Sequence, residues 1–219
     1  MSFDRLAPHY RWMEFVLAGG RLQRCRTAFL NEVGRRRDVL LLGEGNGRFL
    51  VECRRALPQA HITCVDSSAR MLDEARRRLV NSGLGAGNTE FLKANALDWK
   101  PPKPGFDLVV THFFLDCFRP DQLEALMAAL ARVATPRATW LLADFRVPPA
   151  GGRRLRALLI HRLMYLFFRF ATDLPAQCLT APDRLLEANG FELRERRLSE
   201  WGLLHSDWWE RRLERSDEV

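Results

Sequence analysis

The residues best placed to do chemistry are three glycines at alternate positions, Gly43, Gly45 and Gly47, within the segment VLLLGEGNGRFL. The apolar run before them and the apolar pattern after them are typical of a buried strand, a tight turn and the start of a helix. Glycines in such a turn let a ligand touch the backbone, because no Cβ stands in the way. The first turn of a helix adds unpaired N–H groups and a partial positive charge. The segment therefore predicts a cofactor site, and the alternative is a turn with a structural role alone.

The spacing of the glycines narrows the class of cofactor. A dinucleotide-binding turn has the pattern G-x-G-x-x-G, and here Arg48 stands where that pattern needs its third glycine. The phosphate-binding loop G-x-x-x-x-G-K-[ST] is absent, since no Lys-Ser or Lys-Thr pair occurs in the chain. The pattern G-x-G-x-G suits a ligand that carries no pyrophosphate.

A carboxylate follows at the end of the next predicted strand. Residues 61–65, HITCV, are rich in β-branched and apolar side chains, and Asp66 comes directly after them. An acidic residue about 20 positions beyond a glycine turn can accept hydrogen bonds from two ribose hydroxyls. Asp66 could instead cap the helix that follows, but Ser67 or Ser68 can fill that role. We expect Asp66 to bind the ligand.

These segments resemble the first two motifs of the class I S-adenosylmethionine-dependent methyltransferases, and later segments fit in the same order. FLKANALDW at 91–99 resembles the motif after the third strand, FDLVVTH at 106–112 the fourth strand, and TWLLAD at 139–144 the fifth. The resemblance implies S-adenosylmethionine as cofactor and S-adenosylhomocysteine as product, with Asn95 against the adenine amino group. The cofactor contacts that it implies are Tyr10, Gly43, Glu44, Gly45, Gly47, Asp66, Ser67, Met71, Asn95, Ala96 and Thr111.

One residue departs from the family pattern. Members usually carry an acidic residue two positions before the first glycine, and this chain has Leu41 there. Glu44, inside the turn, is the candidate for the missing carboxylate. On that hypothesis, the substitution Glu44→Gln weakens cofactor binding.

The chemistry itself asks little of the protein. Methyl transfer from a sulfonium is an in-line displacement, in which the protein mainly supplies proximity and alignment. A base is needed only when the acceptor is a poorly acidic hydroxyl or a carbon acid. His112, at the end of a predicted strand, titrates near neutral pH and is the candidate base, with Asp116 to orient or replace it. The alternative is that His112 only hydrogen-bonds the adjacent loop. No cluster of His, Cys and carboxylate residues predicts a metal site.

The elements that must position these residues alternate strand and helix to about residue 145, which predicts an α/β fold with helices on both faces of a parallel sheet. The resemblance completes this as a Rossmann-like, doubly wound, mostly parallel seven-stranded sheet, with an antiparallel C-terminal edge hairpin (191–199 and 203–209) and an N-terminal helical lid. We expect one domain, with the lid at 1–34, the cofactor-binding core at 35–147, and a substrate-side helix and the hairpin at 148–219.

The lid is predicted from the N-terminal pattern FDxxAxxY, which runs from Phe3 to Tyr10. It resembles the opening of quinone-pathway and related small-molecule methyltransferases. There the segment folds over the cofactor, and its tyrosine approaches the methionine moiety. The alternative is a capped amphipathic helix that packs on the core.

Residues 153–170, RRLRALLIHRLMYLFFRF, predict a long apolar and basic helix. At 3.6 residues per turn, one face carries most of its polar residues: Arg154, His161, Arg162, Tyr165 and Arg169, interrupted by Leu158. Such a helix can line a substrate pocket with its polar stripe in solvent. It can also lie in a membrane interface with its arginines near lipid headgroups. Both alternatives suit a hydrophobic acceptor.

The composition limits the class of protein and its surroundings. The 219 residues are 47% apolar and 28% charged, which is ordinary for a globular domain. The five cysteines are scattered and odd in number, which predicts free thiols in a reducing compartment. The N-terminus lacks the layout of a signal peptide, and no run of about 18 uncharged apolar residues occurs. We expect a cytoplasmic protein without a membrane span.

Three functions stay open on the sequence. The first and favoured one is methyl transfer to a small, largely apolar acceptor. The second is an RNA methyltransferase, which the net charge of +7 permits, but the aromatic residues concentrate in an apolar helix instead of lying among exposed basic residues. The third is a protein of this fold that binds the cofactor or a partner without catalysis. The sequence does not determine the oligomeric state.

Overall fold

The computed structural model describes residues 20–100, 105–171 and 180–212, without the side chains of residues 163–171. Its strands are β1 (Asp38–Leu42), β2 (His61–Asp66), β3 (Thr89–Lys93), β4 (Phe106–His112), β5 (Ala134–Phe145), β6 (Phe191–Ser199) and β7 (Leu204–Arg211). Its helices are α2 (Gly20–Arg26), α3 (Arg48–Ala56), α4 (Ala69–Asn81), α5 (Pro120–Val133), α6 (Gly151–Ala171) and α7 (Asp183–Ala188), with short 3-10 turns η2 (Leu115–Cys117) and η3 (Glu200–Gly202).

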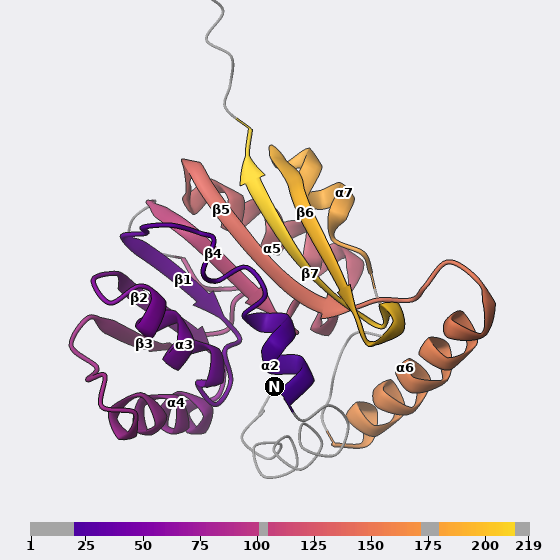
Figure 1. Ribbon diagram of the computed structural model, residues 1–219, viewed down its shortest axis with the longest axis horizontal. Helices are drawn as coiled ribbons and strands as arrows, with labels where there is room; N and C mark the ends of the chain where they lie inside the picture. Colours follow the sequence, from indigo (N-terminus) through magenta and orange to yellow (C-terminus); the bar gives the residue numbers. More distant parts are fainter. Residues whose placement is uncertain (1–19, 101–104, 172–179, 213–219) are drawn as a thin grey trace, which may run out of the picture.

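The strands of the described residues form one sheet in the order β3-β2-β1-β4-β5-β7-β6 (Figure 1). All neighbours from β3 to β5 pair in parallel, whereas β7 pairs antiparallel with both β5 and β6. The predicted fold class and the antiparallel C-terminal hairpin are therefore confirmed. The hairpin places β6 at the edge and inserts β7, the strand of opposite direction, beside β5.

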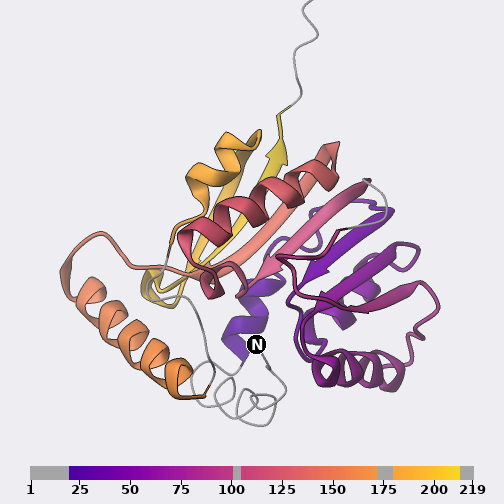
Figure 2. The same ribbon diagram turned by 180° about the vertical axis from the view of Figure 1, so that it is seen from behind.

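Strand β1 shows why the apolar runs form the centre of the sheet. Val39 and Leu41 belong to the core on the side of α3 and α4, and Leu40 and Leu42 to the core on the side of α5 and α7. None of the four side chains is more than 2% exposed. A parallel strand covered by helices on both faces has no solvent side, so its sequence is apolar without alternation. Figures 1 and 2 show these two helical layers from opposite sides.

The register brings the chemistry-bearing residues to one edge of the sheet. Leu42 pairs with Val65 on one side and with Thr111 on the other, and His112 pairs with Ala143. The carboxyl ends of β1, β2, β4 and β5 therefore lie in a row. In open α/β sheets ligands bind outside the carboxyl ends of the strands, so this edge is the candidate site.

A buried ionic network joins the C-terminal hairpin to α7. Asp207 is 0% exposed and accepts hydrogen bonds from Nε and Nη2 of Arg196 at 2.7 and 2.6 Å, while its Oδ1 lies 3.0 Å from Nδ1 of His205. Arg196 also donates to Asp183 of α7 at 2.7 Å. Burial acts to raise the pKa of Asp207, but hydrogen bonds from Arg196 and His205 outweigh it and hold the pKa below its usual value.

The predicted N-terminal lid is described only in its last part. Tyr10 and the rest of residues 1–19 lie outside the described residues. Within residues 20–33 the helix α2 ends at Arg26 and is followed by turns, so the helical section is shorter there than predicted. Cys25 of α2 contacts Ser206 (Sγ to Oγ 3.0 Å), and Gln23 donates to the carbonyl of Arg48 at 3.0 Å. This part of the segment packs beside the candidate site, and the role of a lid stays a prediction.

Candidate active site

The glycine turn joins β1 to α3, and different structural constraints explain glycine at its three positions. All three have positive φ: 62° at Gly43, 67° at Gly45 and 82° at Gly47. A Cβ at Gly43 would overlap the ring of Phe114, and one at Gly47 would lie 2.6 Å from the Cα of Ala75. In the described part of the chain, a Cβ at Gly45 would meet nothing within 4 Å. Packing therefore explains glycine at the first and third positions, and the second keeps open space where a ligand can approach the backbone.

Glu44 places a carboxylate inside this turn. Its Oε1 accepts hydrogen bonds from the backbone N–H groups of Phe49 at 2.8 Å and Leu50 at 3.0 Å, in the first turn of α3. Gly47, which precedes α3, has no side chain to cap it, so Glu44 supplies the missing acceptor. Burial raises the pKa of Glu44 to about 7, although the charge of Arg26 and the two backbone hydrogen bonds act to lower it. Leu41, where the family carries an acid, is 1% exposed in the core.

Asp66 stands between the glycine turn and α4. Its Oδ2 accepts from the N–H of Gly45 at 3.2 Å, and its Oδ1 accepts from the N–H of Ser68 at 2.9 Å. The cap of α4 is Ser68, whose Oγ accepts from the N–H of Met71 at 3.2 Å. The sequence left open whether Asp66 or a serine caps α4, and the structure shows that Ser68 does.

The other predicted cofactor contacts fall into two groups. Asn95 and Ala96 follow β3 at the same edge; Asn95 is exposed, donates to Asp98 at 2.6 Å and accepts from the N–H of Leu97 at 3.3 Å. Ser67 is partly exposed beside Asp66, and Met71 is buried in the first turn of α4.

Thr111 lies at the predicted strand end, but its side chain is buried in the core. Its side chain is 0% exposed, and its hydroxyl accepts a hydrogen bond from the indole N–H of Trp140 at 2.8 Å. A buried indole N–H needs an acceptor, and Thr111 supplies it from the neighbouring strand. The side chain is therefore committed to the core, and a cofactor contact at this position is left to the backbone.

His112 closes β4 as a buried imidazole that is 7% exposed. Its ring meets Phe49 edge-on with 4.5 Å between centroids, and its Nδ1 has no hydrogen-bond partner among the described residues. Burial holds the pKa of His112 well below its usual value, and the nearby charge of Arg26 lowers it further. The ring is therefore neutral at pH 7, and the same burial makes it a weaker base than an exposed imidazole.

Two carboxyl groups meet where β4 and β5 end. Burial raises the pKa of Asp116, in η2, to about 6. Asp144 is 2% exposed and accepts from the backbone N–H of Phe145 at 2.7 Å and from that of Asp116. Burial and the neighbouring charge of Asp116 raise the pKa of Asp144 well above its usual value. The two carboxyl groups are therefore harder to ionise than carboxyl groups in water.

The sequence reasoning gave no role to two of these residues. Asp144 ends the predicted strand TWLLAD, and residues 144–146 were expected on the substrate side of the ligand-binding edge, but the side chain of Asp144 was not assigned a role. Arg26 had no usable signal, because it lies in a segment interpreted only for its helical pattern. The structure brings the guanidinium of Arg26 over the ring of Phe113, 5.2 Å from its centroid, and its charge acts on both Glu44 and His112.

Aromatic side chains surround this edge of the sheet. Phe113 and Phe145 meet with 5.2 Å between ring centroids, and Phe114 and Phe118 with 5.0 Å. Phe114 lies directly against Gly43. The loop that follows β4 thus brings apolar rings next to the glycine turn.

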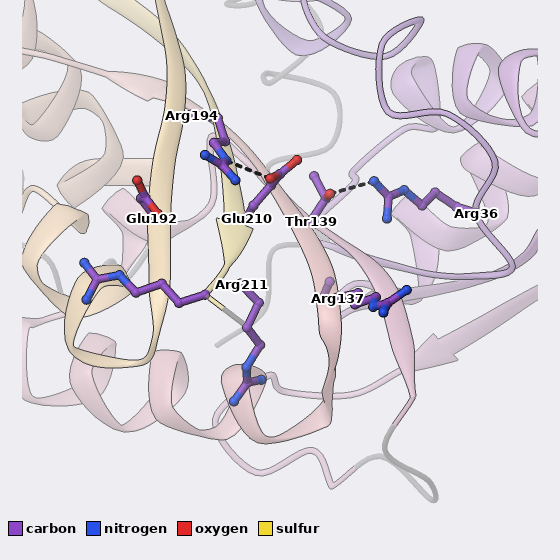
Figure 3. Close-up of a pocket in the computed structure, with 9 residues that line it drawn as sticks. Arg36, Arg137, Thr139, Glu192, Arg194, Glu210 and Arg211 are labelled. Atoms are coloured by element: carbon purple, nitrogen blue, oxygen red, sulfur yellow. Dashed lines mark hydrogen bonds and ion pairs between the residues drawn. The ribbon is translucent and has the colours of Figure 1, made fainter. Parts of the chain in front are cut away.

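A basic cavity of about 580 Å³ lies at the other end of the strands from the candidate site, where β5 and β6 begin and β7 ends (Figure 3). Its charged lining comprises Arg36, Arg137, Glu192, Arg194, Glu210, Arg211 and Arg212. Arg194 pairs with Glu210 at 2.7 Å, and Arg36 donates to Thr139 at 2.7 Å. The cavity is remote from the glycine turn along the strands and is not part of the candidate active site.

Comparison with known proteins agrees with this site. The family described as "Methyltransferase domain" matches residues 39–137. The chain is 29% identical to the demethylmenaquinone methyltransferase of Deinococcus radiodurans over 212 residues, which cover 90% of this chain and 86% of the relative. It is 26% identical to the ubiquinone/menaquinone biosynthesis C-methyltransferase UbiE of Desulfotalea psychrophila, over 83% of this chain and 69% of the relative.

Solved structures share the fold at lower identity. An O-methyltransferase family protein from Burkholderia thailandensis superposes with a TM-score of 0.70 at 20% identity, over 87% of this chain and 56% of that chain. The magnesium protoporphyrin IX methyltransferase ChlM from Synechocystis, solved with bound S-adenosylhomocysteine, gives a TM-score of 0.67 at 18% identity, over 96% and 97%. The chain therefore spans little more than half of the first of these structures and nearly all of the second.

The matched domain, the relatives and the fold all point to one class of protein: the chain is similar to the class I S-adenosylmethionine-dependent methyltransferases. It is an enzyme, and S-adenosylmethionine is its cofactor.

Proposed function

We propose that this enzyme methylates a small, largely apolar aromatic acceptor of the quinol class. The observation that carries the proposal is the set of phenylalanine rings beside the glycine turn, Phe113, Phe114, Phe118 and Phe145. Aromatic side chains that line a binding site favour the binding of a flat apolar ring. The names of the two relatives, which concern menaquinone and ubiquinone biosynthesis, support the same class of acceptor.

The residues present fit the cofactor. We propose that the backbone at Gly45 and the carboxylate of Asp66 hold its amino acid and ribose parts, and that Asn95 lies at the adenine. Open space at Gly45 and the position of Asp66 beside it support this arrangement. When bound, S-adenosylmethionine supplies a methyl group activated by a positive sulfur.

The chain's own residues then position the acceptor and take up the proton that it loses. If the quinol oxygen attacks the methyl carbon, the carbon–sulfur bond breaks and the hydroxyl proton is released. If a ring carbon attacks instead, the hydrogen on that carbon leaves afterwards and restores the aromatic ring, so either reaction releases one proton that needs an acceptor. We propose His112 as the acceptor of that proton, because its ring is neutral and its Nδ1 has no partner among the described residues. Asp116 and Asp144, whose pKa values are both raised by burial, orient the acceptor's oxygen by hydrogen bonding. The aromatic rings keep water from the reacting atoms.

A labelled-methyl assay tests the proposal. The enzyme is incubated with S-adenosylmethionine labelled in the methyl group and with a demethylated quinol, a polar catechol, or bulk RNA. We expect label in the quinol, much less in the catechol and none in RNA. Label in RNA alone, with RNA binding that weakens steeply as salt rises, would establish the RNA methyltransferase instead.

A pair of variants on neighbouring elements tests the cofactor site. Asp66→Asn keeps the size of the side chain but removes the charge that we expect to hold the ribose, so cofactor affinity should fall at least tenfold. Asp73→Asn, at an exposed position of α4, is the control and should leave the affinity unchanged. Equal affinity of the two variants would exclude the ribose role of Asp66.

A further inference from the structure

The helix α6 has two apolar faces, and only one of them packs on the protein. Ala157 is 1% exposed and His161 5% exposed, with the His161 ring 5.8 Å from that of Phe145. On the opposite side Leu155, Leu158 and Leu159 are 73%, 44% and 59% exposed. Their spacing of three and four residues places these leucines on one face. The predicted polar stripe is interrupted at His161, which is turned inward.

Arginines surround the exposed leucines. Arg153, Arg154, Arg156 and Arg162 are all exposed, and α6 contains no acidic residue. The guanidinium of Arg153 lies over the ring of Trp201, 5.6 Å from its centroid, and Trp201 in η3 is 67% exposed. In Figures 1 and 2 this helix lies at the outer margin of the molecule. The result is an apolar strip with a basic rim and an aromatic ring at one end.

We propose that α6 and Trp201 form a docking surface for an anionic lipid bilayer. Leucines at the centre can enter the acyl boundary, while arginines extend to the headgroups and tryptophan sits at the interface. No helix of the described residues could cross a bilayer, so the contact is one of lying on the surface.

Charge argues for lipid over a second copy of the chain. If α6 met α6 of another molecule, the four exposed arginines named above would face their copies on the other helix, and neither helix has a carboxylate to offset them. An anionic headgroup layer supplies the opposite charge, at roughly 1 kcal/mol per arginine near the surface. The docking surface goes beyond the proposed function but is compatible with that function. The helix α6 follows β5, and the end of β5 carries Asp144 of the candidate active site.

Vesicle co-sedimentation tests the surface without any acceptor, so its failure leaves the proposed function in place, and a failed methyl-transfer assay leaves the surface in place. The protein is mixed with vesicles of phosphatidylcholine alone or with 30% phosphatidylglycerol. We expect binding to the anionic vesicles that weakens as salt rises.

Variants of exposed side chains locate the contact. Leu155→Gln, Leu158→Gln and Leu159→Gln together should weaken binding at least tenfold, and Arg154→Gln with Arg156→Gln about thirtyfold. The matched controls on α4, Val80→Gln and Arg77→Gln, should bind as the wild type does; Val80 is 53% exposed and Arg77 is exposed.

Three outcomes would overturn the proposal. They are equal binding to neutral and anionic vesicles, equal loss in the α4 controls, and a concentration-dependent dimer that the leucine variant abolishes. Cofactor binding measured on each variant confirms that it is folded.

Discussion

The substitution Glu44→Gln tests how a partly buried acid with a raised pKa can serve the glycine turn. The glutamine amide keeps an oxygen that can accept from the N–H groups of Phe49 and Leu50, now bonded to Glu44 at 2.8 and 3.0 Å. What the variant loses is the ability to ionise. Any effect that depends on pH therefore reports the charge, separate from the capping of α3.

The size of the effect follows from the shift in pKa. Burial raises the pKa of Glu44 from 4.5 to about 7 in the folded protein. Between these values the native state binds a proton that the unfolded chain has released, so the free energy of unfolding falls as pH rises through this window. At about 1.4 kcal/mol per pKa unit the full loss is roughly 3 kcal/mol. It is complete above pH 7 and absent below pH 4.5.

Urea unfolding of the cofactor-free protein measures this term. The difference in unfolding free energy between Glu44→Gln and wild type should grow by about 2 to 3 kcal/mol between pH 5 and pH 8, in favour of the variant. Taking the difference cancels the titrations of Asp116 and Asp144, which both proteins share. Glu52→Gln, at the ion pair with Arg55 on the surface of α3, is the control and should show no such growth.

The same variant tests the cofactor hypothesis from the opposite direction. S-adenosylmethionine carries positive charge, so its binding should favour an ionised Glu44 and be weakened by the glutamine at pH 8. A constant stability difference across pH would refute the buried-acid reasoning. Unchanged cofactor affinity would refute the idea that Glu44 replaces the acid missing at Leu41.

Three further predictions concern the turn, the hairpin and the base. Gly47→Ala should lower the free energy of unfolding by more than about 2 kcal/mol, because the new Cβ overlaps Ala75 and the backbone is left-handed. Gly45→Ala should lower it by only about 1 kcal/mol but should weaken cofactor binding. Urea unfolding measures the change in stability, and calorimetric titration measures the change in cofactor affinity. Asp207→Asn should destabilise by about 3 to 5 kcal/mol, because it removes the buried negative charge that pairs with Arg196 and leaves that arginine only Asp183; a loss below 1 kcal/mol would contradict this. His112→Ala should slow methyl transfer. In the wild type we expect the rate to fall only below pH 6.5, because the pKa of His112 lies well below that value, and the variant should lose this fall. An unchanged rate and pH profile would exclude the base role.

Local patterns in the sequence were enough to predict the sheet and the cofactor turn. Strand, glycine turn and helix are neighbours along the chain, so the segment from Val39 to Leu50 carries its own signal. Asp66 was predicted at the ligand-binding edge because it directly follows a buried strand. The C-terminal hairpin was predicted as 203–209 for its second strand and found at Leu204–Arg211.

Thr111 shows why such a prediction stops at the strand end. The sequence placed it correctly at the carboxyl end of β4. Whether its hydroxyl turned toward a ligand depended on Trp140, 29 residues away, whose indole N–H needed an acceptor. The hydrogen-bond partner of a buried side chain belongs to the packing of two strands and is not a local property.

The sequence by itself determined the order of the elements, and it predicted the class of cofactor and the edge of the sheet where we expect the cofactor to bind, because hydrophobic periodicity and glycine spacing are local. Only the tertiary structure decided the charges at that edge. It brought Arg26 near Glu44 and His112, joined Asp116 to Asp144, and turned the leucines of α6 outward. Burial and electrostatic fields are set by atoms from distant segments, and these decide which groups hold a proton and which surface stays exposed.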